Sequence, residues 1–276
     1  MNPRVYILDG HNFKDYPLGG QLTFQHQFLH MQHELDIRLV GLSVDPDEPP
    51  GTWVTRHIGD RSYPFLPVHQ FNRNGGKHVI PYSFRYTWGA FRYATFIADE
   101  APDFIYSHNP EMLLPFLRLT HRPKLIYHVH GSPLRKIAYS KYPFFRLPGV
   151  KHSYLKLLRA VFHHAHKVIW ASTDGLEEAL RYFPELSAKS SVLFNSVNTQ
   201  LFTPRDKIAS RSALGYAHDE IIAAFVGRLS DIKGLDLIID SIKLLADEGT
   251  HIRLLVIGDG EAREKLIRQV ERLSLS

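Results

Sequence analysis

Short apolar runs alternate with amphipathic segments along most of this 276-residue chain. Apolar runs of about four to six residues between polar turns predict buried strands, and apolar positions three or four residues apart predict helices. We expect strands at residues 5–8, 37–42, 104–106, 125–129 and 168–171, and helices at residues 21–34, 82–98, 112–119, 152–162 and 176–182. This alternation is typical of a parallel sheet with helices on both faces.

The alternation stops at a polar, turn-rich stretch over residues 195–204 and then begins again. Strands are expected at residues 221–226 and 254–257, and helices at residues 235–245 and 263–273. We therefore predict an α/β chain with two Rossmann-like doubly wound domains, residues 1–198 and 199–276. The second is expected to be truncated, because a domain of this type usually needs roughly 100–150 residues.

The composition agrees with a folded protein. Hydrophobic residues make up 44% of the chain and aromatic residues 12%, which is enough to bury a core and excludes global disorder. The absence of cysteine excludes disulfides and thiolate ligands and favours a reducing compartment. No signal-peptide core and no apolar run of membrane-spanning length is present, so we expect a cytoplasmic protein.

The net charge of +5 favours an anionic partner without choosing among phosphates, nucleic acid and lipid. The strongest local concentration of charge is the stretch from Arg135 to Lys167, which mixes Lys and Arg with aromatic residues and contains no acidic residue. Basic-aromatic surfaces suit an anionic membrane surface. The alternative is an ordinary helix whose apolar residues face the core. Nucleic-acid binding has only the basic charge in its favour, and we do not expect it.

The most informative chemistry follows the strand expected at residues 221–226. There the sequence Phe225-Val-Gly-Arg-Leu-Ser-Asp-Ile-Lys-Gly234 leads from a strand into a helix. Ligands of open α/β sheets bind at the carboxyl ends of strands, so Arg228 and Lys233 stand where a ligand is expected. Two permanent cations beside a helix N-terminus suit a diphosphate. The alternative is a pair of solvated loop charges.

Two glycine-containing turns are weaker signals. Gly258 lies in a second strand–turn–helix sequence, where glycine permits close backbone approach, although a plain turn explains it equally well. Gly19 and Gly20 follow the first strand and open a helix, which leaves two amides able to meet an anion. A flexible loop is the alternative at that position.

A histidine pair ends the strand expected at residues 125–129. His128 and His130 lie two positions apart, so both point to one face. A metal pair is one interpretation, but no carboxylate or third histidine stands at ligand spacing in the sequence. We predict a hydrogen-bonded core histidine at position 128. At position 130, next to the loop that Gly131 permits, we predict a functional histidine.

Taken in order, these motifs resemble glycosyltransferase family 4. The motifs are Gly19-Gly20, His130-Gly131, a strand ending in Ser172, the linker Asn195-Ser-Val-Asn198 with Phe202 after it, Val226-Gly-Arg-Leu229, Lys233-Gly234 and Gly258-Asp-Gly260. Ser196 and Asn198 stand where the family usually has Gly and Asp. The resemblance covers nearly the whole chain.

The resemblance implies a GT-B fold and transfer of a sugar from a nucleotide sugar, with retention, to a glycan or lipid-linked acceptor. Residues 1–198 would face the acceptor, and residues 199–276 would bind the donor. His130 matches the histidine close to the transferred sugar. Gly19, Gly20, Arg228, Lys233 and Gly258 match donor-binding positions. No cofactor and no metal are expected, because the two cations can stabilise the leaving diphosphate.

Two other classes of protein compete with this interpretation. A truncated, non-catalytic relative could hold an acceptor or partner through the first domain. A Rossmann oxidoreductase is opposed by the absence of the G-x-G-x-x-G fingerprint.

Overall fold

The structure is a computed structural model that describes residues 2–16, 19–72, 82–120, 122–131 and 148–275. It divides into two compact units, Met1–Asn198 (unit 1) and Thr199–Ser276 (unit 2). The described strands form two separate sheets, and no helix or strand is described between residues 193 and 206. Each unit is therefore described by itself.

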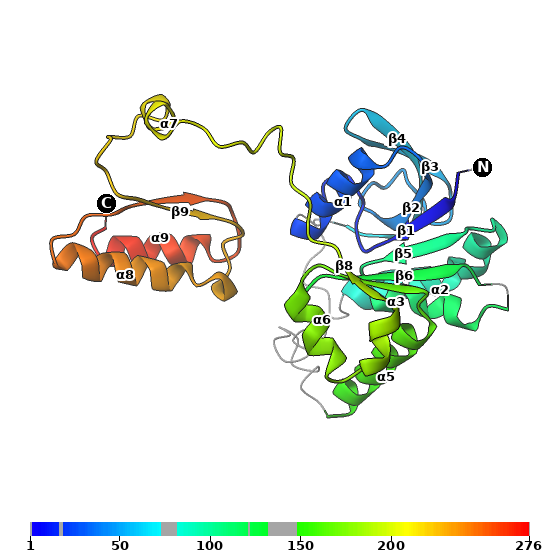
Figure 1. Cartoon of the computed structure of the whole chain (residues 1–276). Helices are drawn as coiled ribbons and strands as arrows, with labels where there is room; N and C mark the ends of the chain where they lie inside the picture. Colours follow the sequence, from blue (N-terminus) through cyan, green and yellow to red (C-terminus); the bar gives the residue numbers. More distant parts are fainter. Residues whose placement is uncertain (1, 17–18, 73–81, 121, 132–147, 276) are drawn as a thin grey trace. The chain divides into compact units, whose positions relative to one another are not determined.

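Unit 1 contains an eight-stranded sheet in the order β3-β4-β2-β1-β5-β6-β7-β8 (Figure 1). Its strands are β1 (Arg4–Leu8), β2 (Asp36–Ser43), β3 (Val54–Ile58), β4 (Arg61–Gln70), β5 (Phe104–Ser107), β6 (Lys124–Val129), β7 (Lys167–Trp170) and β8 (Ser190–Val192). Every neighbouring pair is parallel except β3 and β4. The carboxyl ends of the central strands therefore meet at one edge of the sheet.

Helices cover both faces of this sheet, as the sequence predicts. The helical segments are α1 (Gly20–Met31), α2 (Tyr82–Asp99), α3 (Pro110–Leu113), η1 (Leu114–Arg118), α5 (Pro148–His164), α6 (Thr173–Leu180) and η3 (Pro184–Lys189). Alternate residues of β1 enter different cores. Tyr6 and Leu8 join the cluster built with α2, α3 and α5, whereas Val5 and Ile7 join the cluster that includes Leu29 of α1.

The sequence prediction missed the hairpin formed by β3 and β4. Pro64 and Pro67 interrupt β4, and a proline argues against a strand because it cannot donate to the ladder. β4 accommodates both residues, with Pro64 opposite Thr55 of β3 and Pro67 opposite Gly41 of β2, where the register shifts. The sheet is therefore dominated by parallel pairs and carries an antiparallel strand at one edge.

Unit 2 repeats the strand–helix alternation on a smaller scale. Its elements are α7 (Lys207–Ala213), β9 (Ile222–Val226), η4 (Asp231–Lys233), α8 (Leu235–Asp247), β10 (Arg253–Ile257) and α9 (Arg263–Arg272). β9 and β10 pair in parallel. The core between the loops and the two long helices includes Leu229, Leu235, Ile239 and Leu266.

The described part of the basic-aromatic stretch is an amphipathic helix. In α5 the side chains of Tyr154, Leu158 and Phe162 are buried in the core, whereas Lys156 and Arg159 are exposed. This agrees with the interpretation of residues 148–164 as an ordinary helix. Residues 135–147 of the stretch, from Arg135 onward, lie outside the described residues. A search of the described helices found none with the length and apolar character needed to span a membrane. Membrane association stays a prediction.

Gly89 gives a test of how α2 packs on β4. A β-carbon at Gly89 would lie 2.1 Å from the Val68 carbonyl oxygen, which is backbone and cannot move aside. Gly→Ala within a helix ordinarily stabilises by about 1 kcal/mol. Here we predict that Gly89→Ala lowers the free energy of unfolding by about 1–3 kcal/mol, because the helix must move off the strand.

Urea denaturation followed by tryptophan fluorescence measures this change, since Trp53, Trp88 and Trp170 all belong to unit 1. Gly149→Ala in α5 is the control, because nothing lies within 4 Å of its β-carbon position. Equal stabilities for the two variants would contradict the packing described.

Candidate functional site

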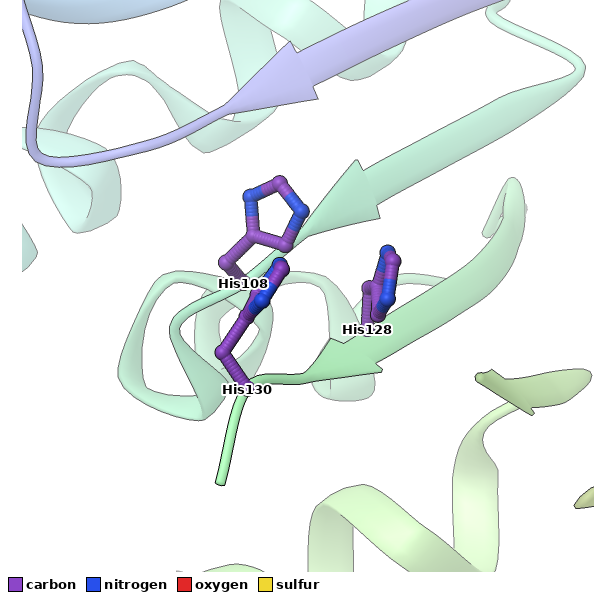
Figure 2. A group of neighbouring side chains, drawn as sticks. All are labelled: His108, His128 and His130. Atoms are coloured by element: carbon purple, nitrogen blue, oxygen red, sulfur yellow. The ribbon is translucent and has the colours of Figure 1, made fainter. Parts of the chain in front are cut away.

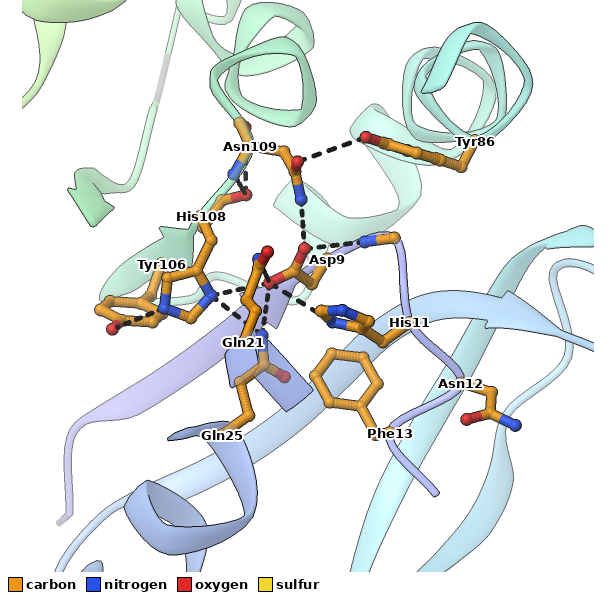
Figure 3. Close-up of polar contacts among 12 residues, drawn as sticks. Asp9, His11, Asn12, Phe13, Gln21, Gln25, Tyr86, Tyr106, His108 and Asn109 are labelled. Carbon is orange, nitrogen blue, oxygen red and sulfur yellow. Dashed lines mark hydrogen bonds and ion pairs between the residues drawn. The ribbon is translucent and has the colours of Figure 1, made fainter. Parts of the chain in front are cut away.

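A buried carboxylate lies at the carboxyl end of β1. Asp9 is completely buried, and its oxygens accept hydrogen bonds from the Gly10 amide at 2.9 Å and the Gln21 side-chain amide at 2.9 Å. The Nδ1 atom of His108 lies 2.7 Å from the same carboxylate. The side-chain amides of Gln25 and Asn109 also donate to it. Figure 3 shows these groups converging on Asp9 from β1, α1 and the end of β5.

These donors explain how a buried carboxylate stays ionised. Burial by itself raises the pKa of Asp9, but attraction to His11 and the hydrogen bond with His108 outweigh it and lower the pKa to about 2. The pKa of His11 is also lowered, because burial outweighs its attraction to Asp9. Since His11 is then neutral at neutral pH, we attribute most of the stabilisation of the carboxylate to its hydrogen-bond donors.

Three histidines cluster beside this carboxylate. His108 follows β5, His128 lies in β6 and His130 follows it (Figure 2). The ring centroids of His128 and His130 are 4.5 Å apart and stacked, and His108 lies 4.6 Å from His130. The Phe24 ring of α1 contacts all three rings edge-on, with centroids 5.0–5.5 Å away.

Burial keeps two of these rings neutral. It lowers the pKa of His128 to about 2 and that of His130 to about 4, and the neighbouring His108 adds to both shifts. His128 is fully buried and lies against the Tyr106 hydroxyl through Nδ1, whereas His130 is only half-buried. At neutral pH these imidazoles can accept hydrogen bonds or bind a Lewis acid, but they do not provide positive charge.

Asp9 and His108 are functional candidates that the sequence prediction missed. His108 supplies the third histidine that local spacing did not reveal, because it comes from a different strand. Both residues come directly after buried strands, which is the signal that could have found them. The prediction that no metal is bound also overlooked the sequence Asp45-Pro46-Asp47 after β2. This is an Asp-x-Asp sequence, whose two carboxylates are of the kind that can bind a divalent cation. There Asp45 accepts a hydrogen bond from the Asp47 amide at 2.9 Å, as in an ordinary turn.

The glycine pair stands at the start of α1. Gly19 precedes the helix and Gly20 is its first residue, and nothing lies within 4 Å of either β-carbon position. The N-cap residue Gly19 has no side chain to cap this helix end, and within the described residues no side-chain cap bonds to its first amides. Gln21, one residue further, binds Asp9 and so joins the glycine pair to the buried carboxylate.

In unit 2 the loops after β9 and β10 lie directly against each other. The Gly227 amide donates to the Ile257 carbonyl at 3.0 Å, and the Leu229 amide donates to the Asp259 carbonyl at 2.9 Å. A β-carbon at Gly258 would lie 1.9 Å from the Gly227 carbonyl oxygen. Glycine at position 258 is therefore required for the two loops to meet.

The two predicted cations lie on the segment between β9 and α8. The Arg228 guanidinium pairs with Glu261 of the neighbouring loop, at 3.0 Å from Nε and 2.9 Å from Nη2, and both side chains are largely exposed. Lys233 is exposed at the end of η4, just before Gly234, whose φ of +67° allows the turn into α8. The structure thus places Arg228 and Lys233 at the carboxyl edge of the second sheet. Their convergence on one ligand stays a prediction.

Comparisons with known proteins match both units. A family model described as Glycosyltransferase Family 4 matches residues 19–201, and one described as Glycosyl transferases group 1 matches residues 206–276. A D-inositol 3-phosphate glycosyltransferase of Segniliparus rotundus is 31% identical over 100 residues, which cover 35% of this chain and 22% of that protein. Its counterpart in Mycobacteroides abscessus is 29% identical over 98 residues, which cover 36% and 21%. The alignments thus span about a fifth of these curated relatives.

Solved structures share the fold over almost the whole chain. Sucrose-phosphate synthase of Thermosynechococcus elongatus is 16% identical with a TM-score of 0.71, covering 99% of this chain and 68% of that one. Anabaena HepE in complex with UDP is 17% identical with a TM-score of 0.63, covering 99% and 66%. WaaG, described as a glycosyltransferase involved in lipopolysaccharide biosynthesis, is 16% identical with a TM-score of 0.64, covering 98% and 67%.

The buried carboxylate gives a direct stability test. We predict that Asp9→Asn lowers the free energy of unfolding of unit 1 by about 3–5 kcal/mol. The asparagine side chain is uncharged, and its NH₂ group cannot accept the hydrogen bonds that the surrounding donors make to the carboxylate. Urea denaturation monitored by tryptophan fluorescence measures the loss. Asp60→Asn, in the exposed turn between β3 and β4, is the matched control and is expected to change stability by less than about 0.5 kcal/mol. An Asp9→Asn protein as stable as this control would show that the carboxylate is not structurally important.

Proposed function

Because this chain belongs to glycosyltransferase family 4, we propose that it transfers a sugar from a nucleoside-diphosphate sugar to a glycan or lipid-linked acceptor, with retention at the anomeric carbon. Its α/β fold is of the GT-B type, as in the solved glycosyltransferases that it resembles. The proposal concerns the whole activity, whereas the chain spans about two thirds of those structures.

The paired loops of unit 2 are the observation that carries this proposal. Arg228 follows the carboxyl end of β9, Lys233 precedes the N-terminus of α8, and the N-cap residue Gly234 has no side chain to cap that end. A helix N-terminus with adjacent cations favours a phosphate group. The Glu261 carboxylate that pairs with Arg228 is exposed, so a diphosphate can replace it without opening the core.

Cations at this position would act on the leaving group. Breaking the bond between the sugar and the diphosphate places developing negative charge on the β-phosphate, and fixed positive charge there lowers the barrier. Charge-assisted hydrogen bonds contribute about 1.5–3 kcal/mol each. Arg228 and Lys233 together would therefore supply several kcal/mol of this stabilisation.

The roles proposed in unit 1 depend on the Asp9 network. The neutral, half-buried His130 would accept a hydrogen bond from a hydroxyl of the transferred sugar. The Gly19 and Gly20 amides at the open end of α1 would contact the donor. Asp9 holds both features in place, because it binds His108 beside His130 and Gln21 beside the glycine pair.

Known proteins support the choice of donor and acceptor class. HepE has been solved with UDP and with UDP-glucose, which supports a uridine nucleotide as the first donor to test. The role of WaaG in lipopolysaccharide biosynthesis supports a lipid-linked acceptor. With such an acceptor, the exposed cations of α5 would face an anionic membrane surface.

The proposal is tested by comparing two arginines at opposite ends of the second sheet. Arg228 lies at the carboxyl edge, whereas Arg253 begins β10 at the amino edge and pairs with Glu220. We predict that Arg228→Ala weakens UDP binding by roughly 10- to 100-fold, which corresponds to the loss of about 1.5–3 kcal/mol. Arg253→Ala removes the same charge and is expected to bind UDP like the wild type.

Calorimetric titration of each variant with UDP measures the affinity for UDP. Transfer is measured by incubating the protein with a UDP-sugar and a lipid-linked or glycan acceptor, and NMR of the product gives its anomeric configuration. A product whose anomeric carbon has the same configuration as in the donor supports the full proposal. UDP binding without transfer to any acceptor would favour a non-catalytic relative. Equal losses of UDP affinity in the two arginine variants would contradict the assignment of the diphosphate site.

A further inference from the structure

The histidine cluster of unit 1 brings three metal-binding side chains to one point. One ring nitrogen from each of His108, His128 and His130 lies within 4.8 Å of the others (Figure 2). The rings come from the ends of β5 and β6, which are neighbours in the sheet. His128 lies within the paired part of β6, and His108 and His130 come directly after the last residue of β5 and of β6.

Two ring nitrogens of this cluster lack a hydrogen-bond partner within the described part of the chain. They are the Nε2 atoms of His128 and His130, and both are buried. Leaving a buried polar atom unpaired costs about 1–3 kcal/mol. Because His128 can donate from Nδ1 to the Tyr106 oxygen, its Nε2 carries a lone pair. Unpaired lone pairs at one place favour an electron-pair acceptor as the ligand.

The third ring is already oriented as in known metal sites. The Nδ1 atom of His108 lies 2.7 Å from Asp9, which fixes the proton on that nitrogen and leaves the lone pair on Nε2. A carboxylate behind a ligating imidazole sets its tautomer and raises its basicity. The Tyr106 hydroxyl lies 3.1 Å from this Nε2, but a hydroxyl proton can rotate away when another group needs the lone pair.

We propose that His108, His128 and His130 form a binding site for a divalent transition-metal ion such as Zn²⁺, with one nitrogen from each ring as ligand. Imidazole ligands favour Zn²⁺, Co²⁺ and Ni²⁺, whereas Mg²⁺ and Ca²⁺ prefer oxygen. A tetrahedral ion at about 2.1 Å from each nitrogen brings the nitrogens to about 3.4 Å apart, so the rings close slightly around it. A fourth position on the ion would hold water.

The surroundings of the cluster suit such an ion. The Phe24 ring contacts all three imidazoles and excludes water from one side, and the ionised Asp9 lies behind His108 and offsets the added charge. All of these groups belong to unit 1, so the site does not depend on the proposed transfer reaction. An ion here would occupy the His130 nitrogen that the proposed function assigns to the sugar, and the two ligands would therefore compete.

Calorimetric titration of the full, metal-stripped chain with Zn²⁺ tests this proposal. We expect one tight site per chain and no comparable binding of Mg²⁺. His130→Gln should weaken Zn²⁺ binding by more than about tenfold. The control is His163→Gln, taken from another histidine pair, because the rings of His163 and His164 in α5 lie 4.9 Å apart and His163 is exposed. This control should bind Zn²⁺ like the wild type.

Two further measurements separate loss of the site from loss of the fold. Tryptophan fluorescence confirms that His130→Gln is folded, which is expected because the residue is half-buried. Titration with Co²⁺ should give the intense visible absorption of a tetrahedral ion in the wild type and in His163→Gln, but not in His130→Gln. The proposal is overturned if the wild type has no one-to-one Zn²⁺ site. It is also overturned if folded His130→Gln binds Zn²⁺ as tightly as the wild type.

Discussion

The burial of the Asp9 carboxylate is the constraint on which the organisation of unit 1 depends. An ionised carboxylate without water is very costly unless hydrogen bonds replace its hydration. Here the replacements come from the end of β1, the first turns of α1 and the end of β5. The hydrogen bonds from Gln21 and Gln25 to the Asp9 carboxylate therefore fix the position of α1 at the edge of the sheet. Phe24 of that helix contacts the histidine rings, and Gln21, one residue after the glycine pair, binds Asp9.

In unit 2 the loops at the strand ends are held together by backbone contact rather than by a buried charge. The loops after β9 and β10 touch because Gly258 has no side chain to separate them from Gly227. Arg228 is exposed at the strand end and pairs there with the solvent-accessible Glu261. Unit 1 thus holds the neutral imidazoles of His128 and His130, and unit 2 exposes the positive charge of Arg228.

Features that depend on residues close together in the sequence could be predicted from the sequence alone. Buried parallel strands are continuous apolar runs, so β1, β2, β6 and β9 could be predicted. The strand–turn–helix motif indicated Arg228 and Lys233 as candidates for binding a diphosphate. The hairpin of β3 and β4 was missed because its two prolines oppose a strand assignment, and β8 was missed because it is three residues long and begins with two serines. The contact between Asp9 and His108 joins positions 99 residues apart and could not be seen in local spacing. The chemistry of the histidine cluster therefore emerged only from the folded chain.

We propose that His130, held beside the Asp9 network, contacts the transferred sugar and that unit 2 binds the nucleotide. Saturation-transfer difference NMR with UDP-glucose, in buffer containing a chelator, tests this most directly. With the wild type, we expect saturation to be transferred to both the uracil and the glucose protons of the ligand. His130→Ala should retain the uracil signals and lose most of the glucose signals. Unchanged glucose signals in a folded His130→Ala protein would contradict the claim.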